Sequence, residues 1–130
     1  MTGCQTATPT LQTASDDAAA KRFTTKGDGA KIYVYRLSGL AGGARIEPVF
    51  IDGRMLGQNG SGTFLVADVS PGHHTVATTA SSISVDAKAG GTCFVRQKHS
   101  AGGPTSSVEP VTAAEGKQGV ASCKRAAALY

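Results

Sequence analysis

The stretch Val49-Phe50-Ile51-Asp52-Gly53-Arg54-Met55-Leu56 decides the fold class of this 130-residue chain. Its two apolar runs flank the dipeptide Asp52-Gly53. A two-residue type I′ turn needs positive φ at both central positions, and Asp and Gly tolerate that conformation, so Asp-Gly between apolar runs is a strong hairpin signal. The stretch therefore predicts two antiparallel strands joined by a tight turn.

Strand patterns continue on both sides of this hairpin. Residues 31–37 are β-branched and aromatic on both faces, which is typical of a central strand. Residues 73–78 and 82–87 alternate apolar with polar side chains, and Pro71-Gly72 marks the turn before them. Because Pro110 cannot donate to a ladder, we place the strand that contains it at a sheet edge. About seven short strands predict a mainly β fold, a single antiparallel β-sandwich over residues 31–130.

A short C-terminal helix completes the predicted domain. Thr112 and Glu115 have the spacing of a capping box, so the helix should begin between them. Gly116 and Gly119 lie in its interior, where each glycine weakens a helix by about 1 kcal/mol relative to alanine.

Composition and charge argue against a nucleic-acid-binding protein. Lys plus Arg number 13 and Asp plus Glu number 9, which gives a net charge of +4. The basic residues are scattered, without the clusters and interleaved aromatics of a nucleic-acid surface. We therefore expect no nucleic-acid partner.

The N-terminus reads Met1-Thr2-Gly3-Cys4-Gln5 and is followed by a tract of small and polar residues. It resembles the end of a bacterial lipoprotein signal, in which small residues precede a cysteine that receives a diacylglyceryl thioether. We interpret residues 1–30 as a signal remnant, the lipidation site Cys4 and a flexible tether that would hold the domain about 25 Å from its anchor. The resemblance, with Gln5 after the cysteine, implies anchoring to the outer membrane of a Gram-negative bacterium, facing the periplasm. The alternative is that Cys4 is a free thiol in a flexible tail.

Two further cysteines, Cys93 and Cys123, remain. An even pair in an oxidising compartment favours a disulfide, so we predict that they are joined. The alternative is two buried free thiols.

No catalytic motif is recognisable. His73 and His74 are adjacent, so on a strand their side chains point to opposite faces and cannot readily chelate one ion. We expect His74 to point inward beside Val76 with its ring hydrogen-bonded to backbone, and we assign Asp52 to its turn. No metal, no cofactor and no enzymatic activity are predicted.

Several elements, in their order and spacing, are similar to a family of small bacterial lipoprotein domains of unknown function. The matching stretches are Val49-Phe50-Ile51-Asp52-Gly53-Arg54, Phe64-Leu65-Val66-Ala67, Val69-Ser70-Pro71-Gly72-His73-His74-Thr75-Val76 and Ala89-Gly90-Gly91-Thr92. The P-G-x-H-x-V element is also shared with carboxypeptidase-regulatory-like sandwich modules. The resemblance implies a sandwich fold and a lipid anchor, and it brings no catalytic residues.

Two functions fit these features. The first is a non-catalytic binding or accessory module of the bacterial envelope, which displays loops to a protein or glycan partner. The second is an immunity lipoprotein that neutralises a toxin delivered into the periplasm. In both cases we expect a monomer whose partner is an envelope protein or a secreted effector. The candidate partner-binding residues lie on three predicted loops: Leu40, Arg45, Gln58, Asn59 and Pro104.

Overall fold

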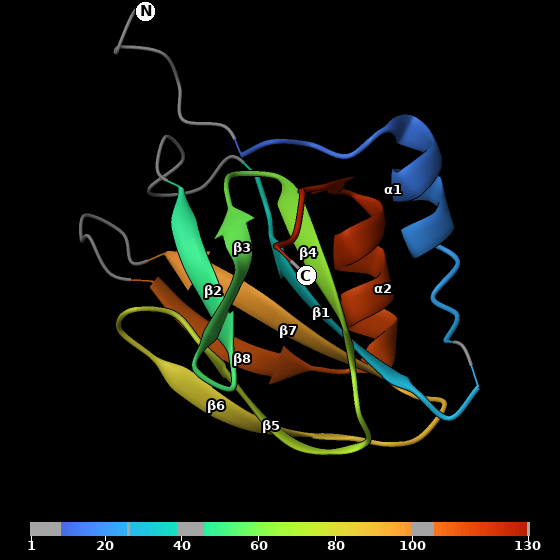
Figure 1. The fold of residues 1–130 in the computed structure, drawn as a ribbon. Helices are drawn as coiled ribbons and strands as arrows, with labels where there is room; N and C mark the ends of the chain where they lie inside the picture. Colours follow the sequence, from blue (N-terminus) through green and yellow to red (C-terminus); the bar gives the residue numbers. More distant parts are fainter. Residues whose placement is uncertain (1–8, 26, 39–45, 100–105, 130) are drawn as a thin grey trace, which may run out of the picture.

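Two β-sheets packed face to face form the body of the protein, and two helices cover the outer face of the larger sheet (Figure 1). The structure is a computed structural model that describes residues 9–25, 27–38, 46–99 and 106–129. Its elements are α1 (Ala14–Ala20), β1 (Ala30–Arg36), β2 (Glu47–Ile51), β3 (Arg54–Asn59), β4 (Thr63–Val69), β5 (Gly72–Ala77), β6 (Ser82–Ala87), β7 (Thr92–His99), β8 (Ser106–Val111), α2 (Ala113–Ala121) and β9 (Lys124–Arg125). The predicted β-sandwich with a short C-terminal helix is confirmed.

The larger sheet has the strand order β8-β7-β1-β4-β9, and the smaller sheet has the order β3-β2-β5-β6. The smaller sheet is antiparallel as expected. In the larger sheet, β1 pairs in parallel with β7, and β4 pairs in parallel with β9. The expectation of a purely antiparallel sandwich was therefore wrong for these two pairs, because β7 and β9 arrive by long connections and not by hairpins.

Turn chemistry explains several connections. Asp52 and Gly53 both have positive φ, 51° and 81°, as the predicted type I′ hairpin requires. Gly72 also has positive φ, at 130°. Pro110 lies in β8, at an edge of the larger sheet, as expected. We call the end of the sandwich that carries the Asp52-Gly53 and Pro71-Gly72 turns the turn end, and the opposite end, where β1 ends at Arg36 and β2 begins at Glu47, the loop end.

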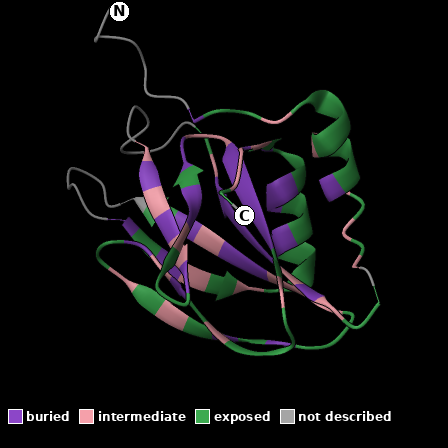
Figure 2. Cartoon of the chain, viewed as in Figure 1, coloured by how far each residue is buried: buried purple, intermediate pink, exposed green. Residues whose placement is uncertain are grey.

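The central strand β1 is apolar on both faces because both of its faces are covered. Ile32 and Val34 face the smaller sheet, whereas Tyr33 and Tyr35 face the helices, and all four side chains are at most 1% exposed. Helix α2 begins at the predicted cap, since the Thr112 side chain accepts a hydrogen bond from the Glu115 backbone N–H at 3.2 Å. Figure 2 shows α2 buried along one side and exposed along the other.

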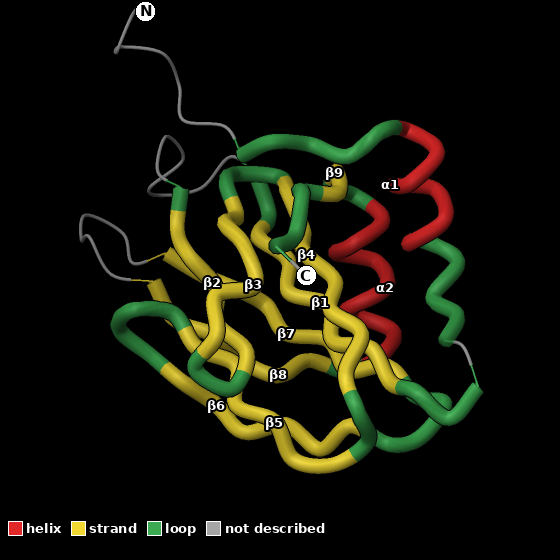
Figure 3. The backbone as a smooth tube through the Cα atoms, viewed as in Figure 1, coloured by secondary structure: helices red, strands yellow, loops and turns green. Residues whose placement is uncertain are grey.

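The C-terminal tail connects the two sheets along one flank (Figure 3). The Ala126 backbone N–H donates to the Phe64 carbonyl of β4, and the Leu129 N–H donates to the Leu56 carbonyl of β3. The Ala127 N–H donates to the Thr10 carbonyl, so the N-terminal segment lies against this tail. No helix in the described ranges has the length and apolar character needed to cross a membrane.

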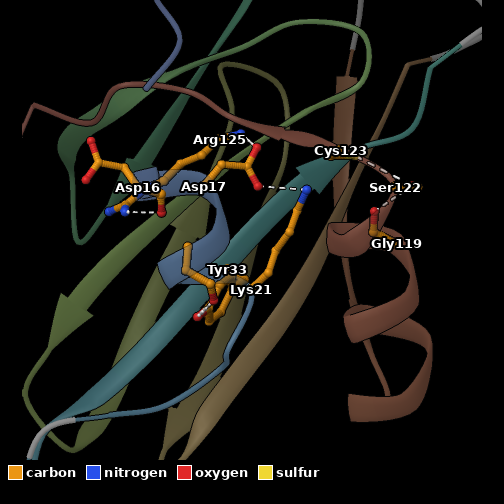
Figure 4. A network of polar contacts seen from close by, with 9 residues as sticks. Asp16, Asp17, Lys21, Tyr33, Gly119, Ser122, Cys123 and Arg125 are labelled. Carbon is orange, nitrogen blue, oxygen red and sulfur yellow. Dashed lines mark hydrogen bonds and ion pairs between the residues drawn. The ribbon is translucent and has the colours of Figure 1, made fainter. Parts of the chain in front are cut away.

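The flexible tether predicted for residues 1–30 is wrong for most of its described part, since α1 is docked on the larger sheet (Figure 4). The Tyr33 hydroxyl donates to the Ala20 carbonyl at 2.7 Å, and the Arg125 backbone N–H donates to the Asp17 carboxylate at 3.1 Å. Ala20 is buried, and Phe23 packs against the rings of Tyr33 and Phe94. These contacts bury apolar side chains of a tract whose mainly polar composition favours a flexible segment. Residues 1–8, including Cys4, lie outside the described residues.

Candidate functional site

In the described part of the chain, the buried polar residues other than tyrosine gather at one end of the sandwich. Of the described residues, seven polar or charged ones are buried, and each belongs to a strand end or connection at the loop end. They are Arg36, Glu47, Asn59, Thr63, Thr78, Gln97 and Ser106. The interior between the sheets is otherwise aliphatic. Burying polar groups costs free energy unless they are hydrogen-bonded, so this concentration distinguishes the loop end from the rest of the interior.

Asn59 is the centre of this loop-end polar cluster. Its side-chain Nδ2 donates to the Val34 carbonyl at 3.0 Å and to Gln97 Oε1 at 3.2 Å, while its Oδ1 accepts from the Thr63 hydroxyl at 3.1 Å. The fully buried Asn59 therefore connects β3 of the smaller sheet with β1, β4 and β7 of the larger sheet.

Two charged residues lie close to this network. Arg36 is 3% exposed and Glu47 is 8% exposed, at the ends of β1 and β2 respectively. Burial lowers the pKa of the Arg36 guanidinium, and the negative charge of Glu47 partly offsets that effect. The loop end thus holds charges of both signs in a nearly dry environment.

Two buried polar atoms of the cluster have no hydrogen-bond partner among the described residues. They are Nε2 of Gln97 and Oγ of Ser106, whose side chains are 1% and 3% exposed. Unpaired buried groups are rare in folded proteins, so these two atoms need an explanation, such as an ordered water or a bound group.

The sequence singled out five residues for partner binding, and the structure describes two of them. Gln58 is exposed near the end of β3 and remains a candidate. Asn59 was a wrong choice, because it is 0% exposed and its amide holds the two sheets together. Leu40, Arg45 and Pro104 lie outside the described residues, in connections whose flanking strand ends meet at the loop end.

The predicted disulfide is not formed, and both cysteines are free thiols. Cys93 packs against the cluster between the sheets and its thiol donates to the Asp86 carbonyl at 3.3 Å. Cys123 belongs to the cluster under the helices and its thiol contacts the Arg36 carbonyl at 3.5 Å. The two side chains lie on opposite faces of the larger sheet, so the sheet itself separates them. Burial raises the pKa of both thiols.

His74 is held as predicted, with one partner that the sequence did not reveal. Its ring Nε2 donates to the Ser70 carbonyl at 2.6 Å, and its Nδ1 donates to the Asp52 carboxylate at 2.6 Å. The other Asp52 oxygen accepts from the Thr75 backbone N–H at 2.8 Å. Asp52 therefore closes the hairpin and binds the histidine. A histidine two residues before a buried valine, together with a turn aspartate, is the only sequence signal that could have suggested this pair.

His73 takes no part in that contact. It lies on the opposite side of β5, 81% exposed, with Nδ1 3.0 Å from the Asp86 carboxylate. Among the residues that the structure describes, no group of three or more His, Cys, Asp or Glu side chains could hold a metal ion.

One comparison with known proteins gives a result. The model of DUF2846, a family of proteins of unknown function, matches residues 26–111, which include β1 to β8 but neither helix. No curated protein and no solved structure matches the chain. Since the match covers more than half of the sequence, the chain belongs to the DUF2846 family of proteins of unknown function.

Proposed function

We propose that this chain is a periplasm-facing outer-membrane lipoprotein, anchored through Cys4, that acts as a non-catalytic binding or accessory module of the bacterial envelope. The Gly3-Cys4-Gln5 sequence supports the anchor. The similarity of residues 49–54 and 69–76 to small lipoprotein domains, and of the P-G-x-H-x-V element to carboxypeptidase-regulatory-like modules, supports a sandwich that binds rather than reacts.

The single observation that carries the binding role is the polar loop end. A domain selected for stability alone has no reason to gather seven buried polar side chains at one end and leave two polar atoms there without partners. Connections on a rigid sandwich are the usual place for recognition residues. The loop end therefore is the surface at which we place the partner.

The test is affinity purification from native envelope extract with the full-length protein as bait. Two variants form a matched pair: Gln58→Arg adds a charge at an exposed loop-end position, and Ala89→Arg adds the same charge at an exposed turn-end position. We expect a stoichiometric envelope protein that the wild type and Ala89→Arg retain and that Gln58→Arg loses. Recovery of the same proteins with all three baits contradicts a partner at the loop end.

The same experiment separates the two functions that the sequence left open. If the protein that depends on Gln58 is a toxin whose activity the bait abolishes, the chain is an immunity lipoprotein. If it is an envelope component, the accessory role stands. Lipidation is tested separately, by incorporation of labelled palmitate into wild type and its absence in Cys4→Ser.

A further inference from the structure

The N-terminal segment and the C-terminal tail build one continuous surface on the flank of the sandwich. Leu11 and Ala126 form a β-bridge, and the Gln12 backbone N–H donates to the Arg125 carbonyl at 2.9 Å. We call this the terminal surface and define it by Leu11, Lys21, Lys124 and Leu129. Strand β9 pairs Lys124 with Thr63, so the terminal surface borders the loop end.

Exposed apolar side chains gather on the terminal surface. In the described part of the chain, the exposed large hydrophobic residues are Leu11, 41% exposed, and Leu129, 67% exposed. A single exposed leucine is unremarkable in any protein. Here both leucines lie on two neighbouring segments that are hydrogen-bonded to each other. Leu11 forms a β-bridge with Ala126, and the Ala127 backbone N–H donates to the Thr10 carbonyl.

The same surface is hollowed, and the exposed Lys124 lies at its edge. Leu11, Lys21 and Lys124 line a hollow of about 480 Å³, and Thr10 and Leu129 line a smaller one of about 190 Å³. The Asp17 carboxylate in the larger hollow is engaged by the Lys21 ammonium at 2.7 Å and by the Arg125 backbone N–H. Leucines beside lysines are the combination that suits the boundary between acyl chains and anionic headgroups.

The chain length before Pro9 limits how far this surface can lie from an anchor at Cys4. Whatever their conformation, the five steps from Cys4 to Pro9 span about 18 Å at most. A seven-residue strand such as β1 is about 24 Å long. Pro9 lies beside the C-terminal tail, at the terminal surface. A bilayer that holds Cys4 therefore lies within about 18 Å of the terminal surface, whichever way the domain is turned.

We infer that the terminal surface contacts the lipid bilayer, with Leu11 and Leu129 at the headgroup boundary and the exposed Lys124 facing anionic headgroups. This inference rests on the lipid anchor of the proposed function. It deepens that function, because the loop end then lies on the membrane side and the turn end points away. The partner is consequently a protein reached at the membrane surface, and not one captured far from it.

The absence of tryptophan from the chain allows a direct test. Single tryptophans are introduced as Leu11→Trp, Leu129→Trp and, as the matched control at the turn end, Ala89→Trp. Each full-length protein carries Cys93→Ala, so that a maleimide lipid couples at Cys4, while the buried Cys123 stays unmodified. The vesicles contain phosphatidylethanolamine and phosphatidylglycerol, with or without a headgroup-level nitroxide lipid.

We expect the nitroxide to reduce tryptophan emission in Leu11→Trp and Leu129→Trp and to leave Ala89→Trp unchanged. Emission that is unchanged in all three, or reduced equally in all three, overturns the inference. So does a concentration-dependent dimer in solution that Leu129→Ser abolishes, since a second copy would then cover the surface. Chemical coupling keeps this result separate from the lipid anchor: if labelled palmitate does not enter Cys4 in cells, the proposed function fails on that measurement alone.

Discussion

The two faces of the larger sheet are packed by different side chains against different partners. Toward the smaller sheet the sheet presents aliphatic residues, with polar groups at the rim, whereas toward the helices it presents aromatic rings. The aliphatic side chains from β1, β4 and β7 are Ile32, Val34, Leu65, Ala67 and Val95. The rings are Tyr33, Tyr35, Phe64 and Phe94.

This difference shows how one sheet accommodates two kinds of neighbour. Branched aliphatic side chains from two twisted sheets interdigitate at the usual separation of about 10 Å. Large rings require a partner with little side chain of its own, and α2 supplies Gly116 and Gly119 where it crosses them. A Cβ at Gly116 would lie 2.2 Å from Phe94 Cγ, and one at Gly119 would lie 2.2 Å from Tyr35 Cε2.

The largest expected effect belongs to the helix-covered face. Helix propensity alone predicts that Gly119→Ala stabilises the protein by about 1 kcal/mol. The contact with Tyr35 predicts the opposite sign, a loss of about 3 kcal/mol or more in the free energy of unfolding, because the ring is buried and cannot move aside. Urea denaturation of the variant measures the difference.

The matched control is Gln118→Ala, which changes an exposed residue of the same helix. It should alter the free energy of unfolding by less than about 0.5 kcal/mol. A Gly119→Ala protein as stable as the wild type would show that α2 does not pack closely on the rings.

The second effect concerns the polar rim of the face between the sheets. Asn59→Ala removes the amide that bonds Val34, Gln97 and Thr63. The buried Gln97 amide oxygen loses its Asn59 partner, whereas the Thr63 hydroxyl keeps its bonds to the Gly60 backbone. We expect a loss of about 2 to 3 kcal/mol in the free energy of unfolding, measured by urea denaturation. Gln58→Ala, at the exposed neighbouring position, is the control and should be nearly neutral. Equal stability of the two variants would remove Asn59 from the connection between the sheets.

A smaller effect tests how α1 is held on the helix-covered face. Tyr33→Phe deletes the hydroxyl that donates to the Ala20 carbonyl at 2.7 Å, and burial raises the pKa of this Tyr33 to about 12. The expected loss is about 1 kcal/mol in the free energy of unfolding, with faster amide exchange in α1. Ser15→Ala, exposed on the same helix, serves as the comparison. Unchanged exchange in Tyr33→Phe would mean that the other contacts of α1, such as the Arg125–Asp17 hydrogen bond, hold the helix without the Tyr33 hydroxyl.

The smallest effect is a pH dependence at the turn end of the face between the sheets. The hydrogen bonds to the Asp52 carboxylate and to the Ser70 carbonyl raise the pKa of His74, because both ring nitrogens donate to acceptors. The hydrogen bond from His74, followed by that from the Thr75 N–H, lowers the pKa of Asp52.

The raised pKa of His74 and the lowered pKa of Asp52 determine how stability changes with pH. The His74 contribution is fully present below the ordinary imidazole pKa and is lost as pH rises through the raised value. The Asp52 contribution is present above the ordinary carboxyl pKa and is lost as pH falls through the lowered one. The pair thus stabilises most between about pH 4 and 6.5.

The Asp52 side chain is half exposed, so solvent weakens its interaction with His74. We therefore expect the free energy of unfolding to fall by less than about 1 kcal/mol between pH 6 and 8.5. Thermal unfolding of the wild type and of His74→Gln over this range measures it. The variant should lose the pH-dependent part, and parallel pH profiles for the two proteins would contradict the charged pair.

Local signals in the sequence were sufficient wherever one short stretch controls its own conformation. The Asp52-Gly53 hairpin, the Thr112 cap and the edge position of Pro110 all follow from the residues involved and their immediate neighbours. Helix α1 carries a similar local signal. Thr13 accepts a hydrogen bond from the Asp16 backbone N–H, which is the same cap arrangement as at Thr112.

The other misplaced predictions concern contacts between distant parts of the chain. An even pair of cysteines in an expected oxidising compartment favoured a disulfide between Cys93 and Cys123. The strand register and the position of α2 place the two side chains on opposite faces of the larger sheet. Asn59 is typical of an exposed turn by composition, yet it is buried because Val34 and Gln97 meet it from the other sheet.

The sequence by itself determined the β class, the main turns, the C-terminal helix and the inward histidine, because these depend on backbone preferences and on the alternation of side chains along a strand. Only the tertiary structure decided which strands run in parallel, why α2 needs its glycines, that the cysteines stay apart and that the polar groups gather at the loop end. The physical reason is that packing and hydrogen bonding between the sheets depend on which residues meet in space, and no local preference specifies that.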